Sequence, residues 1–286
     1  MTKTYTKKLE QAVWDSQSLL CVGLDPVLER LPDTKLFKNK TKTDAERVAT
    51  FCKIIIDVTS PYCCSYKINI AFFESLGAAG IGVFETLIDY IDYIPSTKII
   101  IADAKRGDIA TSSEQYRDAF YRRFNVDAIT LNPLMGFETL APYLDNPEKG
   151  LYVLVLTSNP GANDFLLQSF RGETIMAQYI ARQLKELSSE AKSHIGMVVG
   201  ATQQQHFSQA IANHPTGGLL IPGIGTQGGR VEPLVKLLAN HTGLPLITSS
   251  RSIIYAGENQ RDWKQAVQRA ARNLKQTLQP LVKQYV

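Results

Sequence analysis

The sequence of 286 residues predicts an α/β protein built as a single (βα)8 TIM barrel, with its site at the C-terminal ends of the strands. Three observations predict this fold. Short apolar runs, too brief for helices, recur along the chain. Helix-like segments separate these runs, and about eight alternations match a closed parallel barrel. Polar or turn residues follow nearly every run at the end where barrel enzymes build their sites.

The expected strands are short and rich in Val, Ile and Leu. They are Leu19–Leu24, Cys63–Ile68, Lys98–Ala102, Ala128–Leu131, Tyr152–Leu156, Ile195–Val199, Gly218–Ile221 and Leu244–Thr248. Helix-like patterns cover Thr43–Thr59, Ser112–Phe124, Gly172–Ser189, Thr202–Asn213 and Gly229–Asn240. Thr43 offers an N-cap with Glu46 three residues later. An open doubly wound sheet is the alternative architecture. Because no linker, repeat or change of composition interrupts the chain, we expect residues 1–286 to form one domain.

Composition excludes several classes of function. The net charge of +4 is spread along the chain, and its densest basic run is a polar loop. That run contains Lys35, Lys38, Lys40 and Lys42. The basic aromatic pattern of an RNA platform is missing, so the run indicates a solvated loop and no nucleic-acid partner is expected. No apolar stretch approaches ~18 residues, so no membrane span is expected.

The cysteines and the first residues predict where the protein works. The four cysteines, Cys21, Cys52, Cys63 and Cys64, lack zinc-site spacing and lie mostly in or beside apolar runs. They are expected to be buried thiols in a reducing compartment. The polar segment Met1–Glu10 has no signal-peptide apolar region. Together these features predict a cytoplasmic protein.

The candidate reaction centre follows the apolar run that begins at Ile99. Asp103 and Lys105 follow the expected strand and are two residues apart, so the alternation of side chains in extended backbone makes them face the same way. Gly107 can end the strand, and Asp108 then begins the next segment. Charges at the end of a buried strand are costly unless they are paired or used. Lys67 ends an earlier run, and together with Asp103, Lys105 and Asp108 it forms an array of alternating charge. Such an array can be buried only if each charge is paired with an opposite one.

A second feature indicates an anion site. The segment Ile221–Gly229 follows an expected strand, is rich in glycine and leads into a helix. Backbone N–H groups in such a turn can approach an anion. The segment lacks the Lys-Ser/Thr of a P-loop, which disfavours a nucleoside triphosphate. Arg251, after the last expected strand, can grip phosphate, and this is the usual phosphate site of barrels. A structural ion pair is the alternative role for Arg251.

Two further observations narrow the chemistry. The long segment Thr157–Gly172 is either a lid that closes over the site or a static connection. The four histidines, His194, His206, His214 and His241, all fall outside the expected strand ends. Histidine base catalysis, a histidine-rich metal site and a Ser-His-Asp triad are therefore not expected.

At this point the motifs resemble a known family. Asp103–Ile109 resembles the DxKxxD(I/V) signature of the orotidine 5′-monophosphate decarboxylases. Val22–Pro26 is similar to the family's first-strand aspartate motif, and Lys67 with Phe73 and Glu74 to its second-strand lysine motif. Residues 222–229 and 250–255 resemble its phosphate end. The resemblance runs from about residue 20 to 257, and the Lys-Arg-Gly-Asp form is similar to the longer bacterial branch.

The resemblance implies a homodimer of (βα)8 barrels that needs no cofactor and no metal. Lys67, Asp103, Lys105 and Asp108 would form the catalytic charge network. Asp108, together with Ile109, would come from the partner subunit. The active sites of the two subunits would therefore be shared.

The resemblance also implies a set of substrate contacts. Asp25 and Lys67 would bind ribose hydroxyls, and Ser158 would read the pyrimidine. The phosphate end would comprise Gly225, Gln227 and Arg251. Ser112 stands where the family usually carries threonine, with Thr111 before it, so either hydroxyl could reach the ribose.

The implied reaction converts orotidine 5′-monophosphate to uridine 5′-monophosphate and CO2, the last step of de novo pyrimidine synthesis. Lys105 would stabilise and protonate the C6 carbanion, and Asp103 would destabilise the substrate carboxylate. Three alternatives stay open. One is a Mg2+-dependent sugar-phosphate decarboxylase of the same superfamily, which shares DxKxxD but needs a carboxylate at the second strand. The others are a non-catalytic phosphate-binding barrel and a Schiff-base aldolase using Lys67 or Lys105.

Overall fold

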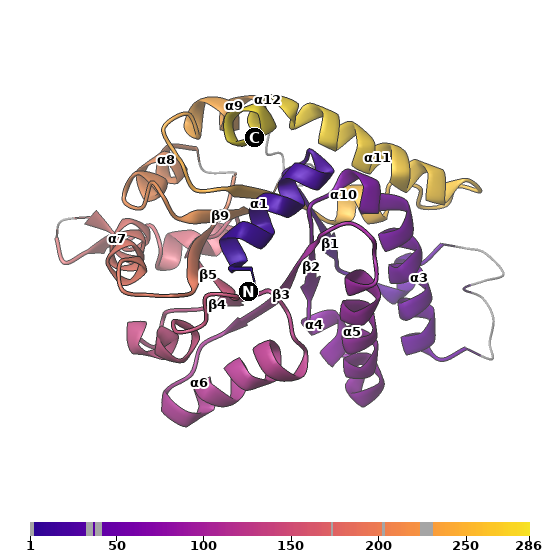
Figure 1. The fold of residues 1–286 in the computed structure, drawn as a ribbon, viewed down its shortest axis with the longest axis horizontal. Coiled ribbons are helices and arrows are strands. Elements are labelled where there is room, and N and C mark those ends of the chain that lie inside the picture. The colour runs from indigo at the N-terminus through magenta and orange to yellow at the C-terminus, as the bar shows by residue number, and fades with distance from the viewer. Residues whose placement is uncertain (1–2, 33–36, 38–41, 173, 202–203, 224–230) are drawn as a thin grey trace.

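The computed structural model describes residues 3–32, 37, 42–172, 174–201, 204–223 and 231–286. Within these ranges, eight parallel strands form one closed barrel in the order β1-β10-β9-β8-β5-β4-β3-β2 (Figure 1). The barrel strands are β1 (Leu20–Leu24), β2 (Ser65–Asn69), β3 (Ile99–Arg106), β4 (Ala128–Leu131), β5 (Gly150–Leu156), β8 (His194–Val199), β9 (Gly218–Ile221) and β10 (Pro245–Ser249). Because β1 pairs with β10, the sheet closes, and the open doubly wound alternative is wrong.

Helices surround the barrel (Figure 1). They are α1 (Tyr5–Ser16), α3 (Asp44–Thr59), α4 (Ala71–Glu74), α5 (Gly77–Asp92), α6 (Ala110–Arg117), α7 (Met176–Ser188), α8 (Gln204–Ala212), α9 (Val231–Leu237), α10 (Arg251–Ile254), α11 (Trp263–Thr277) and α12 (Gln279–Tyr285). Shorter 3-10 turns are η1 (Leu28–Arg30), η2 (Ser60–Tyr62), η4 (Phe137–Tyr143) and η5 (Pro160–Asp164). A π segment, η3 (Asp118–Arg123), continues α6.

All eight apolar runs are confirmed as barrel strands, with boundaries shifted by a few residues. The largest shift is in β3, which continues to Arg106, so Asp103 and Lys105 belong to the strand instead of following it. The N-cap of α3 is also confirmed. Thr43 Oγ1 accepts a hydrogen bond from the Glu46 N–H at 3.2 Å, and the Glu46 carboxylate accepts one from the Thr43 N–H at 2.7 Å.

Two helix predictions need correction. The pattern at Gly172–Ser189 predicts a helix throughout, but α7 begins only at Met176. Before it, β6 (Ser169–Phe170) and β7 (Thr174–Ile175) pair as a short antiparallel hairpin that uses the residues expected in the first helical turn. The segment Thr157–Gly172 thus contains η5 and the first strand of this hairpin. The helix expected at Ser112–Phe124 begins earlier, at Ala110, and its α-helical part ends at Arg117.

The core explains why the strand sequences are almost wholly apolar. Every residue of β1, β4 and β9 is buried, since outer helices cover one face and side chains fill the barrel on the other. The four cysteines are free and buried, as the sequence predicts. No helix within the described ranges is long and apolar enough to cross a membrane.

Helix α1 covers the end of the barrel where the strands begin (Figure 1). The Tyr5 hydroxyl lies 3.0 Å from the Tyr152 hydroxyl near the start of β5. Lys8 Nζ donates to Asp127 Oδ1 at 2.6 Å, immediately before β4. Gly150 is required here, because a Cβ at this position would lie 2.9 Å from the Tyr5 ring. With this end covered, the C-terminal ends of the strands form the open face.

Candidate active site

Three adjacent strands place the charged residues of the site. Register pairs Gly23 of β1 with Lys67 of β2, and Asn69 of β2 with Asp103 of β3. Asp25 lies one residue beyond the end of β1. Because parallel strands end at the same face, these side chains converge there although they lie far apart in the sequence.

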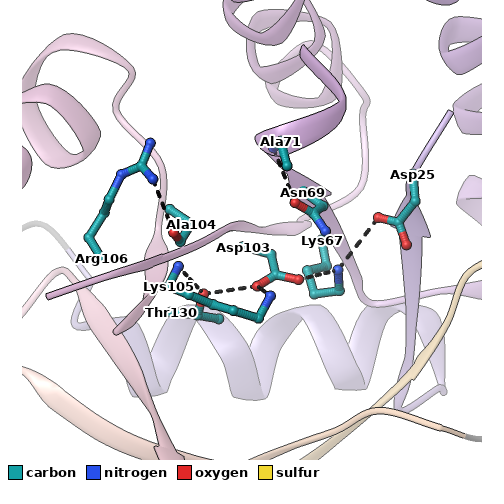
Figure 2. Close-up of polar contacts among 9 residues, drawn as sticks. All are labelled: Asp25, Lys67, Asn69, Ala71, Asp103, Ala104, Lys105, Arg106 and Thr130. Atoms are coloured by element: carbon teal, nitrogen blue, oxygen red, sulfur yellow. Dashed lines mark hydrogen bonds and ion pairs between the residues drawn. The ribbon is translucent and has the colours of Figure 1, made fainter. Parts of the chain in front are cut away.

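The converging side chains form a row of alternating charge, Asp25–Lys67–Asp103–Lys105 (Figure 2). Lys67 Nζ lies 3.6 Å from Asp25 Oδ1 and 2.7 Å from Asp103 Oδ2. Lys105 Nζ donates to the other oxygen of Asp103, Oδ1, at 2.5 Å. The side chains of Lys67 and Asp103 are only 8% and 10% exposed, whereas that of Lys105 is 48% exposed. The row therefore runs from a buried ion pair to an ammonium group at the open face.

In this row, burial and the neighbouring charges shift the pKa values in opposite directions, and the neighbouring charges have the larger effect. Burial alone would raise the pKa of Asp103, but Lys67 and Lys105 together hold it well below its usual range. Burial alone would lower the pKa of Lys67, yet the carboxylates of Asp25 and Asp103 raise it above its usual value. Both groups are therefore charged at neutral pH. The array that the sequence predicts for Lys67, Asp103 and Lys105 is thus present in one chain.

The backbone at Lys105 departs from a regular strand. Its φ angle is +47°, in the left-handed region that L-residues seldom occupy. The register of β3 against β4 shifts between Ala102 and Arg106, which marks a bulge. The Lys105 N–H donates to Thr130 Oγ1 of β4 at 3.0 Å. The bulge turns Lys105 so that its Nζ bonds to the Asp103 carboxylate two residues earlier.

A cavity of about 310 Å³ lies over this row. Its walls include the four charged residues and polar groups from other strand ends, namely Asn69, Thr130, Thr157, Ser158, Asn159, Thr248, Ser250 and Arg251. The structure therefore brings Asp25, Lys67, Asp103, Lys105, Ser158 and Arg251 to one cavity, as the sequence predicts. Gly225 and Gln227 lie outside the described residues, although Gly223, just before them, lines the same cavity.

The remaining predicted residues point elsewhere in this chain. Asp108 does not line the cavity, and its carboxylate accepts a hydrogen bond from the Ile109 N–H at 2.8 Å. Ile109 is 51% exposed, and Ser112 and Thr111 are exposed on α6. The chain turns away at Gly107, where a Cβ would come within 2.4 Å of the Asn132 carbonyl oxygen. Asp25, not Asp108, is the second carboxylate in the row of this chain.

Sequence reasoning assigned six polar residues of the cavity to no role in the site, namely Asn69, Thr130, Thr157, Asn159, Thr248 and Ser250. Thr130 lies in the middle of an apolar strand, and Asn69 ends β2, where its side chain accepts from the Ala71 N–H at 3.2 Å. Thr130 alternates with Ala128 along β4, so both face the barrel interior. A lone hydroxyl among the inward positions of an apolar strand was the signal that could have indicated it.

A larger cavity, of about 860 Å³, lies at the opposite end of the barrel between α1 and α12. Its walls include Trp14, His241 and Tyr285. None of the ion pairs of the charged row lies there. We therefore assign the site to the smaller cavity, since barrel enzymes place their chemistry at the C-terminal strand ends.

A closed (βα)8 barrel with a buried row of alternating ammonium and carboxylate groups at its open face defines a barrel enzyme acting on a small charged molecule. A profile of the orotidine 5′-phosphate decarboxylase / HUMPS family matches residues 18–266. The chain belongs to this family.

Individual relatives resemble the chain over most of its length. The orotidine 5′-phosphate decarboxylase of Phocaeicola vulgatus is 36% identical over 255 residues, spanning 89% of this chain and 90% of that protein. The enzyme of the same name from Delftia acidovorans is 36% identical over 279 residues, spanning 96% and 98%. The solved structure of Leishmania donovani OMP decarboxylase superposes with a TM-score of 0.76 at 29% identity, covering 96% of each chain.

Proposed function

We propose that this protein decarboxylates orotidine 5′-monophosphate to uridine 5′-monophosphate and CO2, a step of pyrimidine biosynthesis. One observation carries the proposal: the Asp25–Lys67–Asp103–Lys105 row shares a cavity with Arg251. The chain is also similar over 89% to 96% of its length to enzymes named for this reaction. A row of fixed charges beside an arginine suits a substrate with both a reacting carboxylate and a phosphate.

The charged row suggests how the reaction proceeds. The bond between C6 and the carboxylate breaks, CO2 leaves, and the electron pair stays on C6. Lys105, whose ammonium lies at the open end of the row, stabilises this pair and transfers a proton to C6. The resulting amine regains its proton from solvent.

Asp103 contributes by repulsion. A carboxylate held ~4 Å from the substrate carboxylate repels it by about 4 kcal/mol at an effective dielectric constant of 20. Departure of neutral CO2 relieves this repulsion. The ammonium groups of Lys67 and Lys105 keep Asp103 ionised, so the repulsion is present whenever substrate binds.

The other cavity residues supply binding. Arg251 grips the phosphate together with Gly225 and Gln227, Ser158 reads the pyrimidine, and Asp25 with Lys67 binds the ribose hydroxyls. Binding energy from the distant phosphate helps to desolvate the reacting carboxylate. The hydroxyl of Ser112 or Thr111 reaches the ribose only from a neighbouring subunit, since both are exposed on α6.

We further propose a homodimer with shared sites. Large apolar side chains are exposed near the turn that carries Asp108: Ile109 is 51% exposed, Leu134 69% and Met135 53%. The loops after β3 and β4 touch, since the Asn132 N–H donates to the Arg106 carbonyl at 2.8 Å. A second copy on this surface would cover the apolar side chains and place Asp108 in its partner's cavity. The four buried free thiols agree with activity in the cytoplasm.

The alternatives fit the charged row less well. A Mg2+-dependent decarboxylase needs free carboxylates, but both oxygens of Asp103 accept from ammonium groups. A Schiff-base enzyme needs a neutral lysine, and the carboxylates beside Lys67 raise its pKa. A non-catalytic barrel has no need of buried, costly charges.

The test is the loss of absorbance of orotidine 5′-monophosphate with purified protein, with and without EDTA. Equal turnover in both conditions is expected. Absence of turnover contradicts the proposed function, and loss on chelation with recovery in Mg2+ favours the metal-dependent alternative.

A further inference from the structure

Thr130 is a buried hydroxyl that bonds to two members of the DxKxxD motif at once (Figure 2). Its Oγ1 donates to Asp103 Oδ1 at 2.9 Å and accepts from the Lys105 N–H at 3.0 Å. The residue is 1% exposed. Asp103 Oδ1 is also the oxygen that accepts from Lys105 Nζ at 2.5 Å. Thr130, Asp103 and Lys105 therefore form a closed ring of hydrogen bonds.

The ring compensates for the irregular backbone of β3. Where the register of β3 against β4 shifts, the Lys105 N–H bonds to a side chain of β4 rather than to its backbone. The left-handed φ of +47° is unfavourable for lysine and persists only where surrounding contacts hold it. The hydrogen bond from the Lys105 N–H to Thr130 is such a contact. The Lys105 side chain is half exposed, so its position depends on its backbone and on Asp103.

The direction of each hydrogen bond matters. An ionised carboxylate only accepts and a backbone N–H only donates, so the single proton of the Thr130 hydroxyl is directed to Asp103. One hydroxyl thus orients the carboxylate and anchors the backbone of its partner. Valine has the same shape but can form neither bond, whereas serine can form both.

We propose that Thr130 is a positioning residue that holds Lys105 and Asp103 in the geometry required for proton transfer to the substrate. The inference rests on the proposed function and deepens it. Thr130 acts through its two neighbours, so it contributes to the chemical step more than to substrate binding. Loss of the Thr130 hydroxyl should therefore lower kcat and leave KM nearly unchanged, because other residues bind the phosphate and the ribose.

The experiment compares Thr130→Val and Thr130→Ser with the wild-type protein. Loss of hydrogen bonds to charged groups predicts that Thr130→Val lowers kcat about 10- to 100-fold with KM changed less than about twofold. Thr130→Ser retains kcat within about threefold of wild type, because the hydroxyl remains. Thr59→Val is the matched control, since it removes an equally buried hydroxyl that bonds to the Ile55 carbonyl and lies outside the cavity. It leaves kcat unchanged.

A second measurement does not depend on turnover. Amide hydrogen exchange at Lys105 is expected to quicken at least about tenfold in Thr130→Val and to stay near wild type in Thr130→Ser, because the N–H loses its acceptor only in the former. If Thr130→Val does not fold, Thr130→Ala replaces it in both measurements. Wild-type kcat in the hydroxyl-free variant, or equal impairment by serine, overturns the inference. Absence of wild-type turnover contradicts the proposed function instead, and the exchange measurement then still tests the ring.

Discussion

Replacing Lys67 by methionine removes the cation in the middle of the charged row and keeps an unbranched side chain that is shorter by one atom. At an effective dielectric constant of 20, a charge 2.7 Å from Asp103 and 3.6 Å from Asp25 is attracted by about 6 and about 5 kcal/mol. The variant regains several kcal/mol of lysine desolvation, but it leaves two carboxylates facing each other. We expect a net loss of about 3 to 5 kcal/mol in the free energy of unfolding at pH 7.

The pH dependence of this loss follows from the pKa of Asp103. In the wild type that pKa lies below the usual value of about 3.9, so its contribution to stability is present above pH ~4 and is lost as pH falls further. Removal of Lys67 raises the pKa of Asp103. The difference in stability between wild type and variant should therefore shrink as the solution is acidified below pH ~4.

Urea unfolding at a fixed protein concentration measures both effects. Lys192→Met is the matched control, because Lys192 Nζ lies 2.6 Å from Asp145 but the two side chains are 65% and 82% exposed. An exposed pair contributes about 0 to 1 kcal/mol, so the control should stay close to the wild type. A loss below about 1 kcal/mol in Lys67→Met would refute the assignment of Lys67 as the ion that holds the buried row together.

Three shorter predictions concern the reaction, the dimer and acid stability. Lys105→Ala should lower kcat at least about 10⁴-fold while changing stability by less than about 1 kcal/mol, because its side chain is half exposed; near-normal turnover would contradict its role. Mixing inactive Lys105→Ala and Asp108→Asn proteins after unfolding and refolding should restore about a quarter of wild-type activity, because half of the dimers then contain one intact site. No restoration would place Asp108 outside the partner's site. Burial lowers the pKa of His194 and His214 to about 4, so the stability gained from their neutral forms is present above pH 6.5 and is lost as pH falls toward 4, by about 3 kcal/mol for each histidine. In the double variant His194→Gln/His214→Gln, the urea midpoint of unfolding should fall less between pH 7 and pH 4.5 than it does in the wild type. An equal fall in both proteins would contradict this assignment.

The sequence predicted the barrel well because each buried strand is a continuous apolar run, which is read without knowing its neighbours. Strand ends were harder to predict. β3 continues through Asp103 to Arg106, although charged residues ordinarily end a buried strand. It does so because Lys105 and Lys67 neutralise Asp103, and Lys67, 36 residues away in the sequence, is invisible in a local pattern.

The site could be predicted in part for the same reason. Lys67, Asp103 and Lys105 were identified because charges at strand ends stand out in an apolar context. The role of Asp25 in the row depends on the register that pairs β1 with β2, which the sequence does not reveal. Thr130 was missed because its importance depends on a backbone bulge at Lys105, a residue of another strand.

The contacts of α1 have a consequence for synthesis of the chain on the ribosome. Tyr5 emerges early, but its hydroxyl partner Tyr152 lies 147 residues later. At 5 to 20 residues per second, the helix waits roughly 7 to 30 s for that partner to be translated. During this interval Tyr5, which is fully buried in the finished barrel, lacks this hydroxyl partner. The contact between α1 and β5 therefore forms only after β5 has been translated, so this end of the barrel is covered long after α1 itself has been made.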